Sequence, residues 1–395
     1  MKNTILLISS TILGLILGYL IFFSFFYLNF EKKFENTISS KEKFYFIKKY
    51  VNILNHVRPE YSDYSHLMFS VINDYKNKNN ILFQGDSWFE QINFPANDNA
   101  ESYKDVNLKN PEIDDFKSLN YIRDWSKSKN FGAINAGTGS YSPSLMSIQL
   151  EVLEKDFKIM PDILVAYIDQ TDLGDENCRY KLNKVYSDNK LIRVEATKSL
   201  TRQAFDYTKM LKLSEINLTS KPKFLKVFYL TNYNLHFEIN KFFKINYFKI
   251  SQIINKGWDN RKIKKCNVDE ILSYLKKPQT SQISYFKSSL EEYLLRATKK
   301  NHIKKIYLVS FPHLEGLKKI YKDSDKNYLN ISDIIDTVLE KNFETLNKKI
   351  YHINFSKITS SNNNLFSYDD YLFDKAHLKQ EPHRVFIREI LNKIN

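Results

Sequence analysis

An uncharged, strongly apolar run from Ile5 to Phe30 limits what this chain can fold into, because so long an apolar segment does not suit a water-exposed surface. A helix needs roughly 20 apolar residues to cross the hydrocarbon layer of a membrane, and this run is longer than that. A cleaved signal peptide is the alternative, since Lys2 supplies the positively charged start of such peptides. No small-residue cleavage site follows the run, so we predict a single-pass signal anchor over residues 1–30 that contacts membrane lipid through residues 5–30.

Positive charges lie on both sides of this run, and they nearly cancel as signals of membrane orientation. Lys2 and the terminal amine favour an amino terminus inside the cell, whereas Lys32 and Lys33 favour the opposite orientation. A lone amino-terminal anchor usually exports the chain that follows it. We therefore expect the body of the protein to lie outside the cytoplasm, in the periplasm or at the cell surface.

The composition supports a folded body and argues against nucleic acid as its partner. The chain has 395 residues, of which 43% are hydrophobic, enough for one large core with or without an insertion. Its formal net charge of +14 comes largely from lysines scattered among Asn, Ile and aromatic residues, without a groove-reading or base-stacking motif. Cys178 and Cys266, the two cysteines, are too few for a metal cluster, and they form either one disulfide or two buried thiols.

Short apolar runs alternate with helix-length segments through the rest of the chain. Each run is apolar on both faces, which is typical of a strand in a parallel sheet covered on both sides. The fold class that we predict is therefore α/β, with a doubly wound, mostly parallel sheet. The predicted strands are Ile81–Gln84, Ala133–Asn135, Ile163–Ile168, Ile306–Phe311 and Ile350–Phe355.

Helices are predicted between these strands and after the last one. Ser142 followed by Pro143 is a typical helix start, and a carboxyl-terminal helix is expected to begin near Glu381. Residues 31–78 are polar and are predicted to form a helical stalk. Residues 179–280, approximately, do not fit the alternation, so we interpret them as a largely helical insertion within the body.

A candidate nucleophile follows the first predicted strand, which ends in Gly85-Asp86-Ser87-Trp88. The carboxyl ends of parallel strands meet at one edge of a sheet, where ligands bind. Glycine allows the chain to leave the strand sharply. We therefore expect the Ser87 hydroxyl to lie at this edge.

A candidate base lies near the other end of the chain, in Asp374-Lys375-Ala376-His377. On a tight turn, a carboxylate three residues before a histidine orients the imidazole through one nitrogen and leaves the other nitrogen for a serine. A serine hydroxyl is a poor nucleophile at neutral pH until a neighbouring base accepts its proton. Ser87, Asp374 and His377 are therefore the candidate catalytic residues.

These two motifs, in this order, resemble the first and last blocks of the SGNH, or GDSL-type, serine hydrolase family. The resemblance implies a flavodoxin-like architecture for residues 79–395 and acyl chemistry by a Ser-His-Asp mechanism, with no cofactor and no metal. Residues 135–141, Asn-Ala-Gly-Thr-Gly-Ser-Tyr, are similar to the second block. They imply that a backbone N–H at Gly139 or Ser140 joins that of Ser87 in the oxyanion hole.

Two further blocks of the family have partial matches. The third block usually reads Gly-x-Asn-Asp, with the Asn side chain as an oxyanion donor, but here Thr171 stands at the Asn position and Gln170 is a candidate substitute. Phe311-Pro312-His313 is similar to the fourth block. From these matches we expect Thr171 in the oxyanion hole, and Trp88, Gln170 and His313 in contact with substrate.

The sequence therefore predicts a membrane-anchored serine esterase that acts on an O-acyl ester, and the family resemblance implies a small acyl group on a cell-envelope glycan. Two alternatives stay open. An O-acyltransferase of cell-envelope polysaccharide would use the same triad, with a sugar hydroxyl in place of water. A non-catalytic, membrane-tethered binding or assembly protein would keep the fold, and Thr171 in place of Asn favours that alternative.

Overall fold

Two groups of segments make up the chain, and each is described by itself. One comprises residues Met1–Tyr50 and Lys198–Lys264, and the other comprises Val51–Thr197 and Lys265–Asn395. The computed structural model describes residues 2–29, 50, 53–54, 69–75, 79–95, 98–102, 112–194, 221–229, 231–232, 235, 266, 268–276, 278–312, 329–342, 349–361, 365–374 and 376–394.

The first unit contains α1 (Lys2–Leu28), the apolar helix at the amino terminus. Its stretch Thr4–Leu28 has a mean hydropathy of 2.4 and is not buried, so by length and composition it suits a membrane span, although a signal sequence has the same properties. Near its end, the rings of Phe23 and Phe224 lie 5.5 Å apart, and the Lys223 ammonium lies 5.1 Å from the ring centre of Tyr27. The anchor stays a prediction.

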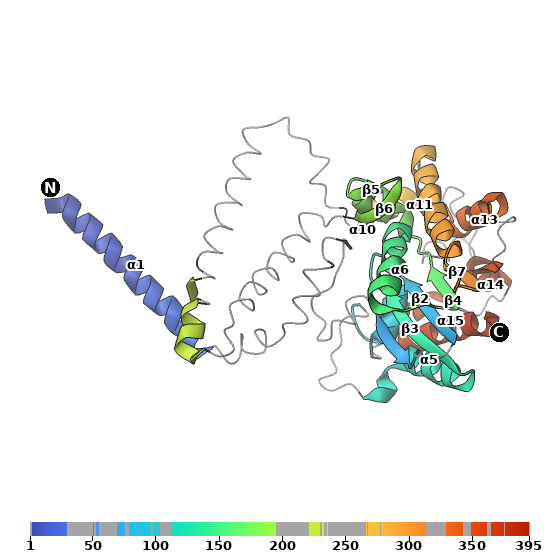
Figure 1. Ribbon diagram of the computed structural model, residues 1–395, viewed down its shortest axis with the longest axis horizontal. Helices are drawn as coiled ribbons and strands as arrows, with labels where there is room; N and C mark the ends of the chain where they lie inside the picture. The colour runs from blue at the N-terminus through green and yellow to red at the C-terminus, as the bar shows by residue number, and fades with distance from the viewer. Residues whose placement is uncertain are drawn as a thin grey trace. The chain divides into compact units, whose positions relative to one another are not determined.

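The second unit is built on a six-stranded sheet of order β1-β3-β2-β4-β7-β8. Strands β2, β3, β4 and β7 of this sheet are labelled in Figure 1. The five strands from β2 to β8 in this sheet are parallel, whereas β1 pairs antiparallel with β3 at the edge. All five predicted strands are present, which confirms the α/β fold with its mostly parallel sheet. The strands are β1 (Ser70–Asn73), β2 (Asn79–Gly85), β3 (Phe131–Gly137), β4 (Ile163–Tyr167), β7 (Lys305–Ser310) and β8 (Lys349–Asn354), with a separate hairpin of β5 (Lys184–Ser187) and β6 (Lys190–Val194).

The order of the parallel strands places a switch point between β2 and β4. Along the chain the sheet grows from β2 outward to β3 and then, on the other side, through β4, β7 and β8. In a flavodoxin-like sheet, the first and third parallel strands diverge at this point and leave a crevice beyond their carboxyl ends. The residues that follow β2 and β4 are therefore placed to meet a ligand.

Helices cover both faces of this sheet. Ile81 and Phe83 of β2 belong to one apolar cluster with Ile122 of α5 and Phe386 of α15, so α5 and α15 cover that face. On the opposite face, Gln84 joins α6 and α11 through hydrogen bonds. The helices of this unit are α4 (Ser87–Glu90), α5 (Lys117–Ser128), α6 (Pro143–Phe157), α7 (Asp172–Gly174), α10 (Val268–Lys276), α11 (Thr280–Thr298), α13 (Ile331–Asn342), α14 (Phe355–Ser361) and α15 (Gln380–Lys393), with 3-10 turns η3 (Gln91–Asn93), η4 (Ile113–Asp115) and η8 (Tyr368–Asp370) and a π-helical turn η5 (Asp175–Tyr180).

The buried Gln84 side chain uses both ends of its amide on this second face. Its Nε2 donates to the Met146 carbonyl at 2.8 Å and to Gln149 Oε1 at 2.9 Å, and its Oε1 accepts from the Tyr293 hydroxyl at 2.8 Å. A buried polar group is costly unless it is paired, and here three partners satisfy it. Gln84 therefore fixes α6 and α11 against β2 just before the candidate nucleophile.

A glycine permits the close approach that brings α4 onto the sheet. A Cβ atom added to Gly137 at the end of β3 would lie 2.3 Å from the Phe89 carbonyl carbon and 2.4 Å from the Glu90 nitrogen. Both are backbone atoms, so a side chain at Gly137 would push α4 away from β3. Gly137 also pairs with Gly85 across the two strands, next to Ser87.

One of the two expectations about organisation needs correction, and the other is largely outside the described residues. The predicted helical stalk of residues 31–78 is wrong at Ser70–Asn73, because β1 pairs there with β3 as an edge strand; most of the remaining stalk lies outside the described residues. Within the predicted insertion of about residues 179–280, the described residues include the β5–β6 hairpin and α10, and most of the interval lies outside the described part of the chain, so the insertion stays a prediction. The Val194 N–H donates to the Ile53 carbonyl at 3.0 Å, which ties the hairpin to the second unit.

Candidate active site

Ser87 is the first residue of α4, directly after β2 and at the switch point of the sheet. Asp86 caps this helix, because its Oδ1 accepts the Trp88 N–H at 2.9 Å. A residue at the first helical position has no acceptor for its N–H within the helix. The turn therefore presents both a half-buried hydroxyl and an available N–H at Ser87.

His377 and Asp374 lie on a tight turn just before α15. Tyr371 and Leu378 pair across this turn as an isolated antiparallel bridge. Asp374 Oδ1 accepts the backbone N–H groups of Ala376 and His377 at 2.9 and 3.0 Å, and Asp374 Oδ2 lies 2.6 Å from His377 Nδ1. The carboxylate is thus held by the backbone of its own turn while it holds the imidazole.

The fold brings this turn to Ser87 across a separation of 290 positions. His377 Nε2 lies 2.8 Å from Ser87 Oγ, within hydrogen-bond distance. Ser87, His377 and Asp374 therefore form one continuous chain of hydrogen bonds. This is the arrangement in which a serine is activated by a base that a carboxylate orients.

The protonation of the imidazole follows from its partners. Burial acts to raise the pKa of Asp374, but the hydrogen bonds from His377 and from the backbone outweigh it and lower this pKa below its usual range. An ionised carboxylate accepts hydrogen bonds only, so the proton lies on His377 Nδ1. Nε2 of the neutral ring is then the acceptor that faces the Ser87 hydroxyl.

Buried hydrogen bonds join this turn and α15, which follows it, to α4 and the 3-10 turn after the nucleophile. Gln91 Nε2 donates to the Leu378 carbonyl, next to His377. His383 of α15 is fully buried, with Nε2 2.8 Å from the Trp88 carbonyl and Nδ1 2.7 Å from Ser118 Oγ. Since a carbonyl accepts only, Nε2 donates and Nδ1 accepts, and burial lowers the pKa of His383 to about 4.

The prediction that Gly139 supplies an oxyanion donor is wrong for this conformation. The Gly139 N–H donates to Glu90 Oε2 at 3.0 Å, and the Glu90 side chain is buried under the turn that follows β3. A backbone N–H that already has a carboxyl oxygen as its acceptor is not free to stabilise a negative oxygen. Glu90 follows the nucleophile by three residues, and no motif of the sequence signalled its role.

Ser140 is the remaining candidate donor of this block. The Tyr141 N–H donates to the Thr138 carbonyl at 2.9 Å, so Ser140 is the third residue of a tight turn. Its φ of 65° lies in the left-handed region, which costs a residue with a side chain about 1–2 kcal/mol. Among the described residues, the Ser140 N–H has no protein acceptor.

The predicted roles of Thr171 and Gln170 are also not supported by their contacts. The Thr171 hydroxyl and N–H both donate to Asp169 Oδ2. Gln170 is buried, and its amide bonds to the Phe311 carbonyl at 3.2 Å and to Asn330 Oδ1 at 3.3 Å. These side chains hold the loop after β4 in place, so neither is free to bind an oxyanion or a substrate.

Trp88 and His313 complete the predicted site residues. Trp88 is only 4% exposed and packs against Tyr167, Phe311 and Phe386, with ring centres 4.7–5.4 Å apart. The α4 turn directs it under the sheet edge into the core, so the expected contact with substrate is wrong. His313 lies outside the described residues.

Buried carboxyl groups lie behind the nucleophile turn. Burial, followed by repulsion from neighbouring carboxylates, raises the pKa of Asp86 and of Asp172 well above the usual value. Asp86 Oδ2 lies 3.3 Å from Ser87 Oγ, farther than the base at 2.8 Å. The hydroxyl therefore has its shorter contact with His377, and Asp86 acts mainly as the cap of α4.

A second Ser-His-Asp array lies within the fold. His352 of β8 places Nε2 2.8 Å from Ser310 Oγ and Nδ1 2.6 Å from Asp336 Oδ1. Ser310 is fully buried, and its hydroxyl also contacts Ser332 Oγ at 2.8 Å. A buried hydroxyl does not reach an ester, so this array is a structural network that joins β7, β8 and α13.

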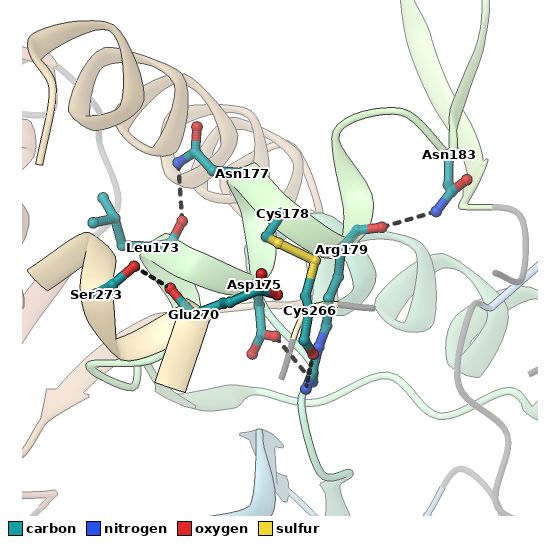
Figure 2. Close-up of a disulfide and its surroundings, with 9 residues drawn as sticks. All are labelled: Leu173, Asp175, Asn177, Cys178, Arg179, Asn183, Cys266, Glu270 and Ser273. Atoms are coloured by element: carbon teal, nitrogen blue, oxygen red, sulfur yellow. Dashed lines mark hydrogen bonds and ion pairs between the residues drawn. A yellow bond between two sulfur atoms is a disulfide. The ribbon is translucent and has the colours of Figure 1, made fainter. Parts of the chain in front are cut away.

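Cys178 and Cys266 form a disulfide, which decides between the two alternatives that the sequence left open. Figure 2 shows it beside Arg179 and Glu270. The two sulfur atoms and Glu270 are the one group of potential metal ligands that the described residues bring together. Because the sulfur atoms are bonded to each other, they are not thiolate ligands, and this group does not form a metal site.

No protein-family model matches the sequence, and no curated protein matches it. Among solved structures, the chain is similar to acetylxylan esterases. A catalytic mutant of Axe2 from Geobacillus stearothermophilus aligns with a TM-score of 0.37 and 9% identity over 82% of this chain and 96% of that chain. Est2A from the rumen bacterium Butyrivibrio proteoclasticus aligns with a TM-score of 0.34 and 9% identity over 81% of this chain and 64% of that chain. Similarities this distant do not bear on activity.

Proposed function

We propose that the chain is a membrane-anchored serine esterase that hydrolyses an O-acyl ester by a Ser-His-Asp mechanism. The observation that carries the proposal is the hydrogen-bonded chain from Ser87 Oγ through His377 to Asp374. A small acyl group on a glycan is the substrate that the SGNH resemblance implies. The body is proposed to lie outside the cytoplasm, where such glycans are found.

The proposed reaction begins when His377 Nε2 takes the proton of Ser87 as Oγ attacks the ester carbonyl carbon. The former carbonyl oxygen becomes negative and accepts the N–H groups of Ser87 and Ser140. When this intermediate collapses, the bond to the alcohol breaks and His377 gives its proton to the leaving oxygen. Water then attacks the acyl-serine while His377 accepts a proton from it, and a second collapse releases the acid and restores the Ser87 hydroxyl.

Asp374 does not need to exchange a proton in this scheme. Its carboxylate keeps the proton of the neutral imidazole on Nδ1 and stabilises the imidazolium that forms during each attack. Its lowered pKa supports this role, because the carboxyl stays ionised at neutral pH.

Covalent labelling tests the proposal directly. We expect the detergent-solubilised full chain to react with a fluorophosphonate probe at about pH 8. Ser87→Ala should abolish labelling, and His377→Ala should slow it at least about a thousandfold, because the base is lost. Peptide mass spectrometry would locate the adduct, and Ser310→Ala is the matched control, expected to label like wild type.

Two results would redirect the proposal. The engagement of Gly139 and Thr171 by other acceptors favours a non-catalytic binding protein, and a folded wild-type chain that does not label would support that alternative. Labelling that depends on Ser87, followed by acylated sugar rather than free acid when a glycan acceptor is supplied, would support an O-acyltransferase instead.

A further inference from the structure

A disulfide and side-chain hydrogen bonds hold the π-helical turn η5 in place. The Cys178–Cys266 disulfide, drawn in Figure 2, joins it to the segment before α10, across a sequence separation of 88. The Asn177 amide donates to the Leu173 carbonyl at 2.9 Å and to the Gln282 carbonyl at 3.1 Å. A π-helical turn is rare in proteins and frequently occurs at functional sites.

The last two residues of this turn both contact Ser140. Arg179 Nη1 donates to Ser140 Oγ at 2.6 Å, and the Tyr180 hydroxyl donates to the Ser140 carbonyl oxygen. The guanidinium is itself held, because Nη1 lies 3.0 Å from Asp175 Oδ1 and Nη2 donates to the Cys266 carbonyl at 3.3 Å. Figure 2 shows the guanidinium at the meeting point of Asp175 and Cys266.

These contacts involve Ser140, the residue of the block 135–141 that has an unusual backbone conformation. Ser140 has a positive φ of 65° without being glycine, so its conformation persists only where neighbouring groups hold it. Arg179 holds its side chain and Tyr180 holds its carbonyl group. Its N–H, in contrast, has no acceptor within the described part of the chain and stays available for a ligand.

We propose that Arg179 and Tyr180 are positioning residues that hold the Ser140 N–H as the second oxyanion donor, and that the Cys178–Cys266 disulfide holds them in place. The inference rests on the proposed esterase function and deepens it. It also assigns the disulfide a role in turnover, because the carbonyl of Cys266 is one of the groups that fix the guanidinium.

The test is ester turnover by the full chain in detergent. Arg179→Ala should lower kcat by about tenfold to a hundredfold with KM changed less than about twofold, because a misplaced donor weakens binding of the transition state alone. Arg179→Lys should recover part of kcat, since an ammonium reaches Ser140 Oγ but lacks the fork that also binds Asp175 and Cys266. Arg123→Ala, which removes an arginine from α5 that bonds to Asn120, is the matched control.

A boronic acid inhibitor supplies a readout that a merely structural role would not move. Such a compound forms a tetrahedral adduct with a serine. Its inhibition constant should therefore rise in Arg179→Ala by about the same factor by which kcat/KM falls. Folding is not expected to limit the variant, because burial raises the pKa of Asp175 to about 7 and its carboxyl can take up a proton when the arginine is removed. Equal thermal unfolding of variant and wild type checks this point.

Reduction of the disulfide tests the last element of the inference. Dithiothreitol should lower the kcat of wild type, whereas a Cys178→Ser and Cys266→Ser double variant should start at the lower value and not respond. If wild type is active and neither Arg179→Ala nor reduction lowers kcat, the positioning role is overturned and the esterase proposal is not. If Arg179→Ala raises KM and leaves kcat unchanged, Arg179 binds substrate and the positioning role is overturned. If wild type is inactive, the positioning role and the esterase proposal are both overturned.

Discussion

At the scale of single residues, the candidate site depends on how one imidazole is oriented. His377 has an ionised partner at Nδ1, and this contact determines which nitrogen faces Ser87. Asp374 is placed by two N–H groups of its own turn, so the pair forms a rigid local unit before it meets the nucleophile. The tertiary structure then needs to form only one further contact, between His377 Nε2 and Ser87 Oγ.

The first residue-scale prediction removes the charge of this pair and keeps its shape. Asp374→Asn should lower kcat by roughly 10⁴-fold, because an amide allows the other tautomer and does not stabilise the imidazolium. Steady-state kinetics with an activated acetyl ester would measure the loss. Asp336→Asn is the matched control, since Asp336 makes the same contact with His352 in the buried array, and it should leave kcat unchanged. Equal effects of the two substitutions would contradict the assignment.

At the scale of elements, the site exists because α15 is fastened to α4. His383 is the central contact, since its two ring nitrogens bond to the Trp88 carbonyl and to Ser118. Burial favours the neutral ring, in which Nε2 donates to the carbonyl and Nδ1 accepts from the Ser118 hydroxyl. The residue is fully buried, and no water is needed to satisfy it.

His383 is expected to make the folded chain less stable as the pH falls. Its pKa is about 4 in the folded chain and 6.5 at its ordinary value, so between these pH values the unfolded chain binds a proton that the folded chain does not. This contribution to stability is present above pH 6.5 and is lost as the pH falls toward 4, by roughly 3 kcal/mol in total.

The corresponding prediction concerns how steeply Tm changes with pH, in addition to the value of Tm itself. His383→Gln keeps a donor and an acceptor but does not titrate, so its Tm should vary less with pH between about 6.5 and 4 than that of wild type. Thermal unfolding in one detergent across that range would measure it. Parallel curves for the two proteins would show that another group carries the acid sensitivity.

At the scale of the whole molecule, the proposed anchor and the α/β body belong to separate units of the chain. The Thr4–Leu28 stretch is long and apolar enough to cross a membrane, and its side chains are not buried by the rest of the protein. The Cys178–Cys266 disulfide encloses residues 198–264 of the first unit between two positions of the second. Its formation fits a body that folds in an oxidising compartment.

Membrane attachment is testable without an activity assay. The full chain should stay with the membrane pellet after alkaline carbonate extraction, because an apolar span is not released by removing charge interactions. A chain without residues 1–30 should appear in the soluble fraction. Amino-terminal sequencing of the mature protein separates the two interpretations: an intact start supports the anchor, and a start after residue 30 would show a cleaved signal peptide.

The sequence by itself determined those features whose causes are local. The apolar run of α1, the five parallel strands, the helix start at Ser142 and the carboxylate three residues before His377 each depend on neighbours within a few positions. The edge strand β1 escaped recognition, because four residues at the sheet margin carry little apolar pattern. The sequence also placed the candidate nucleophile, Ser87, directly after the end of a strand.

Only the tertiary structure decided which groups are available. Gly139 and Thr171 have the right chemistry for an oxyanion hole, but Glu90 and Asp169 already accept their hydrogen bonds. Likewise, the disulfide, the contacts of Arg179 and the distance between Ser87 and His377 depend on atoms far apart in the chain. A hydrogen bond requires two groups at one place, and the sequence pattern specifies residue types along the chain rather than distances in space.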